Sequence, residues 1–191
     1  SGRLVGNTFY MNSFANGPYT IDVSSPENPK VLSNLKIDMG RPLDGTTVSA
    51  VENEDPATNG KILVLSRRQM MDSVVIDVSN PRAMKILSTV PGATAHTYTC
   101  IEDCRYVYGS DSGVIIDLRD PTKPVLLRNK WWDVTDRVGA HDLTEVEPGF
   151  VAVSANPVSF LDTKDPANPK LIFNLPKTPP PLIPAVRTSA Q

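Results

Sequence analysis

Residues Val74–Pro81, with the sequence VVIDVSNP, contain the unit that decides the fold of this chain. Three β-branched apolar residues lead into Asp77, and Pro81 follows four residues after that aspartate. Such a run predicts a buried strand, because β-branched side chains fit the pleated surface of a sheet. The aspartate can accept backbone N–H bonds as the chain turns, and the proline presets φ for the turn. The unit therefore predicts a strand, a tight turn and an antiparallel return.

Four copies of this unit occur along the chain. Their aspartates are Asp22, Asp77, Asp117 and Asp162, and the prolines four residues later are Pro26, Pro81, Pro121 and Pro166. Successive aspartates are 55, 40 and 45 residues apart. The blades of known propellers take about 40–50 residues each, so the spacing predicts one four-stranded blade per copy. We expect each aspartate to cap a turn in its own blade, so that the four do not form a carboxylate cluster.

The strand signals between the copies predict an all-β fold, a β-propeller with three full four-stranded blades and one partial blade. The full blades span residues 45–90, 94–131 and 139–175, and the partial blade spans residues 7–37. The first strands of the full blades are expected over residues 46–52, 94–102 and 140–147. We recognise no strand before residue 7, so the first blade is expected to lack its inner strand. Residues 176–191 are expected to form a proline-rich arm.

The incomplete first blade leaves two ways to close the ring. A propeller closes because an open edge strand invites aggregation. In one solution, residues 185–190 supply the missing strand and close a four-bladed ring. We favour the other, in which this chain is part of a larger ring completed by another chain or by further sequence.

The repeat also supports a family resemblance. Residues 74–81 and the segment Asp165–Pro169 (DPANP) resemble the LVIVD repeat, which is named after its apolar core ending in Val-Asp. The chain departs from that pattern at Met84, where a second proline is expected, and at Arg119 and Lys164, which replace a serine. The resemblance implies a β-propeller that is secreted or lies on the cell surface. It implies no activity, because the family is defined by its repeat.

The two cysteines, Cys100 and Cys104, flank an expected turn between two strands of one blade. This spacing allows a disulfide across the hairpin, and a pair of reduced thiols is the alternative. The extracytoplasmic location that the resemblance implies favours the disulfide, since disulfides persist in oxidising compartments.

The only two histidines, His96 and His141, each lie 21 residues before a repeat aspartate. Counting in the second blade places Thr46 at the same position. We expect His96 and His141 to lie at the mouth of the central channel, with Asp142 beside them. These four residues are candidate ligand-binding residues, and the two histidines are candidate metal ligands. In the alternative, each imidazole bonds to its own backbone, whereas imidazoles about 4–5 Å apart around an acidic partner would favour the ligand role.

Composition excludes several classes of function. The chain carries 19 basic and 21 acidic residues, so its net charge of −2 predicts no nucleic-acid partner. No apolar run approaches the roughly 20 residues of a transmembrane segment. Phosphate-binding glycine loops, nucleophile elbows and zinc-protease motifs do not occur. The aromatic residues Trp131, Trp132, Tyr106 and Tyr108 are expected to pack between blades.

Two function classes remain open. The first, which we favour, is a non-catalytic, secreted or cell-surface module without a cofactor. It would bind a protein partner or a small ligand through loops on one face of the ring, at residues 53–59, 67–72 and 131–137. The second is a hydrolase or lyase whose site at the channel mouth uses His96 and His141, with a divalent metal as its cofactor.

Overall fold

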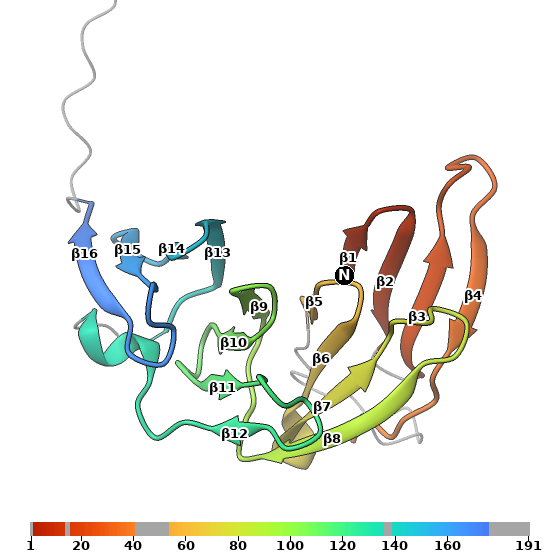
Figure 1. Cartoon of the computed structure of the whole chain (residues 1–191), viewed down its shortest axis with the longest axis horizontal. Coiled ribbons are helices and arrows are strands. Elements are labelled where there is room, and N and C mark those ends of the chain that lie inside the picture. Colours follow the sequence, from red (N-terminus) through yellow and green to blue (C-terminus); the bar gives the residue numbers. More distant parts are fainter. Residues whose placement is uncertain (1, 14–15, 41–53, 136–138, 176–191) are drawn as a thin grey trace, which may run out of the picture.

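A computed structural model of the chain describes residues 2–13, 16–40, 54–135 and 139–175. These residues form four antiparallel sheets of four strands each, and the strands of every sheet follow chain order. The sheets stand side by side along an open arc, with the first strand of each sheet on the inner side (Figure 1). The chain therefore has the predicted β-propeller architecture. None of the helices among these residues is long and apolar enough to cross a bilayer.

Each sheet is formed by one continuous stretch of chain. The first contains β1 (Gly2–Val5), β2 (Thr8–Ser13), β3 (Gly17–Asp22) and β4 (Lys30–Asn34), and the second contains β5 (Ala57–Thr58), β6 (Ile62–Arg67), β7 (Asp72–Asp77) and β8 (Lys85–Pro91). The third contains β9 (Tyr98–Ile101), β10 (Tyr106–Gly109), β11 (Ile115–Asp117) and β12 (Val125–Leu126), and the fourth contains β13 (Asp142–Glu147), β14 (Phe150–Ser154), β15 (Ser159–Asp162) and β16 (Lys170–Asn174). Two short 3₁₀ helices are η1 (Arg68–Met70) and η2 (Trp131–Val134).

The first sheet has an inner strand that the sequence analysis did not predict. β1 pairs with β2 across the two-residue turn formed by Gly6 and Asn7. Gly6 has φ +56°, a conformation that glycine adopts without strain and that two-residue hairpin turns require. The first blade thus has four strands and not the three expected over residues 7–37. The inner strand was not predicted because a four-residue strand is too short to recognise by pattern.

The inner strand of the second sheet lies later in the chain than predicted. The strand expected over residues 46–52 falls outside the described residues, and β5 pairs with β6 around Asn59 and Gly60. Asn-Gly is a strong hairpin signal, and Gly60 has φ +84°. Residues 54–59, which we interpreted as part of a loop, therefore supply the inner strand and its turn, while residue 53 of that expected loop is not described. This correction changes which residue of the second sheet lies at the channel mouth.

The hydrophobic core lies between the sheets. We call the face of a sheet that meets the next sheet in the chain its trailing face, and the opposite face its leading face. Val64 and Val75 on the trailing face of the second sheet pack with Val107 and Ile116 on the leading face of the third, and all four are fully buried. Burial of such a side chain contributes roughly 1.5–3 kcal/mol. The sheets are thus held together by side chains from both faces.

The aromatic residues pack between the third and fourth sheets, as predicted. Trp131, Tyr106 and Tyr108 belong to the cluster that joins these sheets. The Trp131 indole is 1% exposed and its Nε1–H donates to the carbonyl of Gly109 at 2.6 Å. The third blade was expected to span residues 94–131, but its outer strand ends at Leu126, because Trp131 begins η2 and makes this contact.

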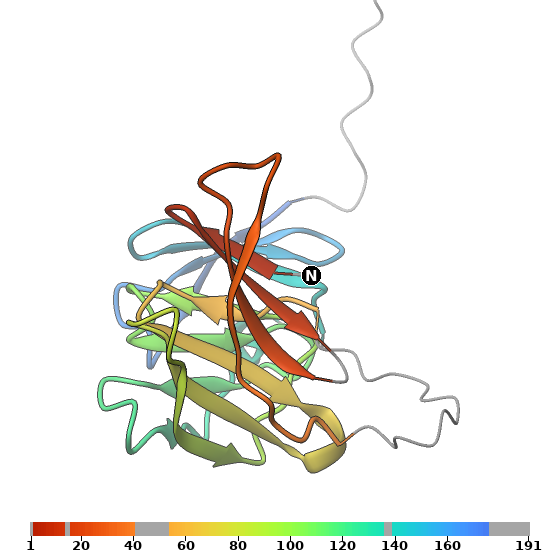
Figure 2. The ribbon, with the colours of Figure 1, turned by 90° about the vertical axis from the view of Figure 1, so that its right-hand side faces the viewer.

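The antiparallel order also decides which loops share an end of the sheets. The start of each inner strand lies at the same end as the hairpin between the second and third strands and as the connection to the next sheet. We call this end the mouth face. The repeat turns and the turns between first and second strands lie at the opposite end, the turn face. Figure 2 views the arc from its first sheet, with the other sheets behind it.

Candidate functional site

One register position recurs on the mouth face, just before the inner strands. Glu54 occupies it in the second sheet, His96 in the third and His141 in the fourth. The residues three positions later pair with equivalent positions of the second strands, as Ala57↔Val64, Thr99↔Tyr108 and Thr144↔Ala152. Because the sheets stand side by side, these equivalent positions lie next to one another.

Bonds between neighbouring inner segments fix the backbone at this position. Glu54 N–H donates to the carbonyl of His96 at 3.0 Å, and Tyr98 N–H donates to the carbonyl of Asp55 at 2.9 Å. The hydroxyl of Thr97 donates to the carbonyl of His141 at 3.1 Å. These hydrogen bonds hold the backbone of the neighbouring segments in place. The side chains at the mouth therefore project from fixed positions, as a preformed site requires.

The side chains of Glu54, His96 and His141 converge. His96 Nε2 lies 3.3 Å from Glu54 Oε2, and His141 Nε2 lies 3.8 Å from the same oxygen. The two imidazole centroids are 5.0 Å apart and the rings meet edge to face. The exposed fraction of the side chain is 13% for His96, 49% for Glu54 and 69% for His141. We call these three residues the mouth cluster; it is anchored at His96 and open to solvent at the other two.

The mouth cluster has the donor set of a transition-metal site. One ligand atom from each residue lies within 4.8 Å of the other two. In a tetrahedral zinc site with bonds of about 2.0–2.1 Å, ligand atoms are roughly 3.3 Å apart. The separation between Glu54 and His96 equals that value, and the separation between Glu54 and His141 is half an ångström longer. The two separations from Glu54 are therefore close to the spacing of donors on one ion.

The other candidate ligands of the sequence analysis are placed differently. Thr46 lies outside the described residues. Asp142 Oδ1 accepts bonds from the Thr97 hydroxyl at 3.2 Å and from the N–H of Leu143 at 2.8 Å. Its carboxylate thus joins the fourth sheet to the third and is not one of the three grouped donors.

Glu54 is the member of the mouth cluster that was not predicted from the sequence. Its place depends on the Asn59–Gly60 turn, which we did not use to set the register of the second sheet. The second sheet also has a longer hairpin between its second and third strands, so Glu54 lies 23 residues before Asp77, whereas each histidine lies 21 before its aspartate. Counting back from the Asn-Gly turn would have found Glu54.

The repeat aspartates lie apart from one another, one on each repeat turn of the turn face. Each accepts a bond at 2.9–3.0 Å from the backbone N–H two residues later, and the four donors are Ser24, Ser79, Arg119 and Lys164. The backbone N–H of Ser24 lowers the pKa of the Asp22 carboxyl, and the Ser79 hydroxyl lowers that of Asp77. These carboxylates cap turns in four separate sheets.

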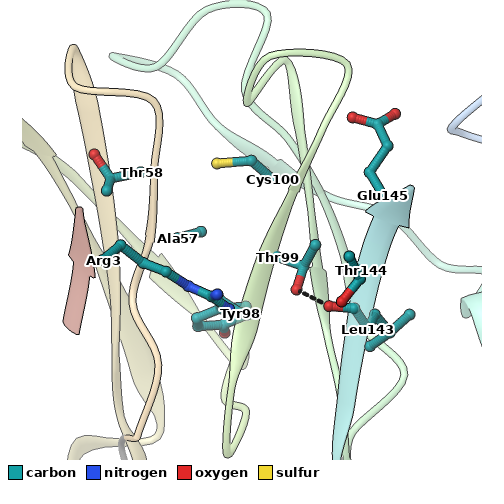
Figure 3. A pocket seen from close by; sticks show the side chains of 9 residues that line it. All are labelled: Arg3, Ala57, Thr58, Tyr98, Thr99, Cys100, Leu143, Thr144 and Glu145. Atoms are coloured by element: carbon teal, nitrogen blue, oxygen red, sulfur yellow. Dashed lines mark hydrogen bonds between the residues drawn. The ribbon is translucent and has the colours of Figure 1, made fainter. Parts of the chain in front are cut away.

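The disulfide between Cys100 and Cys104 is present and closes the turn between β9 and β10 on the turn face. Neighbouring sheets hold this turn, since Asn59 Nδ2 donates to the carbonyl of Asp103 and the N–H of Glu102 donates to the carboxylate of Glu145. Beside the turn, the inner strands line a cavity of about 270 Å³ (Figure 3). It contains the Arg3 side chain, which pairs with Asp55 at 3.3 Å.

The hairpin at residues 67–72, one of the expected contact loops, lies on the mouth face and is tied to the site. Arg67 makes a double hydrogen bond to the carboxylate of Asp72, at 2.8 and 2.6 Å. Arg68 pairs with Asp111 Oδ2 at 2.7 Å, and Asp111 Oδ1 accepts the backbone N–H of His96 at 2.7 Å. In the expected loop at residues 131–137, residues 131–134 form η2 and residues 136–137 are not described.

No protein-family model and no curated protein matches this sequence. Solved structures match the fold: hydrazine synthase from Kuenenia stuttgartiensis has 13% identity and a TM-score of 0.58, and the match covers 88% of this chain and 46% of that chain. A functionally unknown protein from Desulfotomaculum acetoxidans has 12% identity and a TM-score of 0.63, with 92% and 55% covered. The Cps50 (Swd1) β-propeller domain from Myceliophteria thermophila has 16% identity and a TM-score of 0.53, with 93% and 59% covered. This chain spans about half the length of these proteins, and at such identities the likeness shows the β-propeller fold alone.

Proposed function

We propose that this β-propeller is a ligand-binding module that holds a divalent transition-metal ion in the mouth cluster. The observation that carries the proposal is the convergence of two imidazole Nε2 atoms, from neighbouring sheets, on one carboxylate oxygen of Glu54 at 3.3 and 3.8 Å. Two nitrogen donors with one carboxylate suit zinc and related metals, whereas calcium and magnesium prefer oxygen ligands throughout. We take zinc as the reference metal.

The exposure of the mouth cluster would let a bound metal ion take a further ligand. Three protein donors leave at least one position of a four-coordinate zinc ion to water or to a ligand atom. Glu54 and His141 lie at the rim, so that position would open toward solvent on the mouth face. A protein partner or small ligand would bind there and contact the hairpin at residues 67–72 and the described part of the following connection, residues 131–135.

We also propose that the module works outside the cytoplasm, secreted or on a cell surface. The support is the disulfide between Cys100 and Cys104, since disulfides persist in oxidising compartments. The resemblance of residues 74–81 to the LVIVD repeat points to the same location.

Metal titration tests this proposal. The protein is stripped with a chelator, and zinc binding is measured by calorimetry on wild type, His96→Ala and Asp142→Asn. We expect one zinc ion per chain, weaker by about 100-fold or more in His96→Ala because a ligand is removed. Asp142→Asn is the matched control: it lies one residue from His141 but outside the cluster, so its zinc affinity should equal that of wild type.

Two results would contradict the proposal. One is a wild-type protein that binds no zinc, copper, nickel or manganese. The other is zinc binding that survives in both His96→Ala and Glu54→Gln, since it would then use other residues.

A metal-dependent hydrolase or lyase is the second candidate, favoured by the three-ligand composition of the cluster. Catalytic zinc sites of the His₂Glu type keep an open position, where a bound water loses a proton near neutral pH. The test compares zinc-loaded wild type with His141→Ala on a panel of chromogenic esters and phosphoesters. Turnover that needs both zinc and His141 would support an enzyme, and zinc binding without turnover of any substrate would favour the binding module.

A further inference from the structure

Neighbouring sheets meet three times along the arc, and each time the trailing face of one sheet packs on the leading face of the next. Tyr10 on the trailing face of the first sheet packs with Leu63 and Ile76 of the second. Contacts at equivalent positions recur between the second and third sheets and between the third and fourth, where Tyr108 and Ile115 meet a leading face. The leading-face residues of the fourth sheet are Val151, Val153 and Leu161. These side chains are at most 3% exposed.

A polar contact accompanies each of these interfaces. A side chain of one sheet donates to the carbonyl of the repeat proline of the next sheet. The three bonds are Ser33 Oγ to Pro81 O at 2.8 Å, Ser88 Oγ to Pro121 O at 2.7 Å and Tyr108 Oη to Pro166 O at 2.6 Å. The repeat proline thus both shapes its own turn and accepts a bond from the sheet before it.

The trailing face of the fourth sheet is also apolar but lies at the end of the arc. Phe160 stands at the register position of Ile115 and stacks on Phe173 with ring centroids 4.6 Å apart. Phe150 stacks on the other side of Phe160, at 5.5 Å. Ile115 is fully buried, whereas Phe160 is only half-buried and Phe173 is 45% exposed. An exposed apolar face of this kind marks an interaction surface.

The leading face of the first sheet lies at the other end of the arc and is the complementary half of the interface. Phe9 and Ile21 pair across β2 and β3, at the positions that Val151 and Leu161 occupy in the fourth sheet. Phe9 and Ile21 are half-buried, whereas Val151 and Leu161 are 0% exposed. The repeat proline of this sheet is Pro26, equivalent to the three prolines that accept bonds inside the arc.

We propose that two copies of this chain dock head to tail, with the leading face of the first sheet of each copy on the trailing face of the fourth sheet of the other. The occupant is argued from the chain itself, because every trailing face inside the arc is covered by a leading face of the same repeat. Two copies supply eight sheets, within the range of about four to eight blades known for propellers, so two equal contacts can close one ring. Figure 1 shows the two end sheets on opposite sides of the open arc.

The inner strands support the same pairing. Inside the arc, the Thr99 hydroxyl donates to the carbonyl of Leu143 on the next inner strand, at 2.7 Å. Thr144 is the equivalent of Thr99 on the fourth sheet. In the docked pair its hydroxyl would meet the inner strand β1 of the other copy, which is the next inner strand around the ring.

The test is the mass of the protein in solution, measured by light scattering over a concentration series. We expect twice the chain mass of 20.8 kDa for wild type and for the control Val125→Asp, an exposed apolar position on the third sheet. Phe160→Asp and Phe9→Asp should each weaken the dimer by about 100-fold, because a charge would be buried at the centre of the contact. Phe173→Asp changes an exposed residue of the same trailing face, so it tests the contact even if Phe160→Asp fails to fold.

Mixing two defective variants tests the head-to-tail arrangement. Phe160→Asp blocks the trailing end and Phe9→Asp blocks the leading end, so an equal mixture keeps one intact contact and should form a one-to-one pair. A wild type of single-chain mass at every concentration would overturn the proposal. So would a mass above two chains, a dimer unaffected by both Phe160→Asp and Phe173→Asp, or a mixture that stays monomeric. Metal binding plays no part in these readouts, so they do not depend on the proposed function.

Discussion

The turn face and the mouth face lie at opposite ends of the same sheets and differ in how they use a repeated position. On the turn face the residue itself recurs, and each aspartate accepts a bond from its own chain two residues later. On the mouth face only the position recurs: the residues change from glutamate to histidine, and side chains from different sheets face one another. A constant residue with a local bond maintains the fold. A recurring position where side chains converge is where a propeller can place chemistry.

The largest expected difference between the two faces is in the effect of zinc on stability. At a zinc concentration 100 times Kd, binding to the native state adds about 2.7 kcal/mol to the free energy of unfolding. For a chain of this size, that raises the Tm by roughly 5–11 °C. Scanning calorimetry should show this rise in wild type and in Asp117→Ala, and should not show it in Glu54→Gln. A rise that persists in both Glu54→Gln and His96→Ala would mean that the mouth cluster is not the site.

Removing a turn aspartate should affect the fold and leave the mouth unchanged. The Asp117 side chain is 11% exposed, and it accepts bonds from the Arg119 backbone and guanidinium. We expect Asp117→Ala to lower the free energy of unfolding by about 2 kcal/mol and the Tm by roughly 4–8 °C. The measurement is urea denaturation of the metal-free protein. Equal stabilities for wild type and variant would refute the capping role.

The contribution of Asp117 should also depend on pH. The Arg119 side chain, followed by its backbone N–H, holds the pKa of the Asp117 carboxyl below its ordinary value. A carboxyl whose pKa is lower in the folded state stabilises the protein fully above its unfolded-state pKa of about 3.9, and loses that contribution as the pH falls through the folded-state value. The stability gap between wild type and Asp117→Ala should therefore be constant from pH 7 to 5 and shrink below about pH 4. A gap that widens in acid would contradict this assignment.

The smallest expected effect is that of Asp22→Ala. Asp22 caps the repeat turn of the first sheet, and the N–H of Ser24 is its main hydrogen-bond donor. It has no arginine equivalent to Arg119 two residues later, since Ser24 stands there. Its loss should lower the Tm by less than the loss of Asp117, when both variants are compared with wild type by scanning calorimetry of the metal-free protein. An equal or larger decrease would mean that a charged partner of the aspartate does not decide how much its turn contributes to stability.

The strength of each sequence signal decided what could be predicted. The unit at residues 74–81 recurs often enough to indicate propeller blades, and the histidines could be placed together because both lie at one distance from a repeat aspartate. Inner strands were predicted least well, since β5 has two residues and β1 four. Strands so short carry too little alternation for a pattern to emerge.

The candidate site was missed in part for a related reason. The histidines are recognisable by residue type, but Glu54 is one of many acidic residues, and only the register of β5 against β6 identifies it. Asp142 was a reasonable expectation from its place beside His141. Its carboxylate instead faces Thr97 of the neighbouring sheet, a contact between sheets that no local pattern contains.

The four sheets also have a mechanical consequence, because each is completed within a continuous run of about 30–35 residues and none of those described takes a strand from elsewhere in the chain. Most contacts inside a sheet are therefore local in sequence. Folding can begin in any one sheet before the interfaces between sheets form. Under force or proteolysis, the molecule should separate at the interfaces between sheets and leave the individual sheets intact.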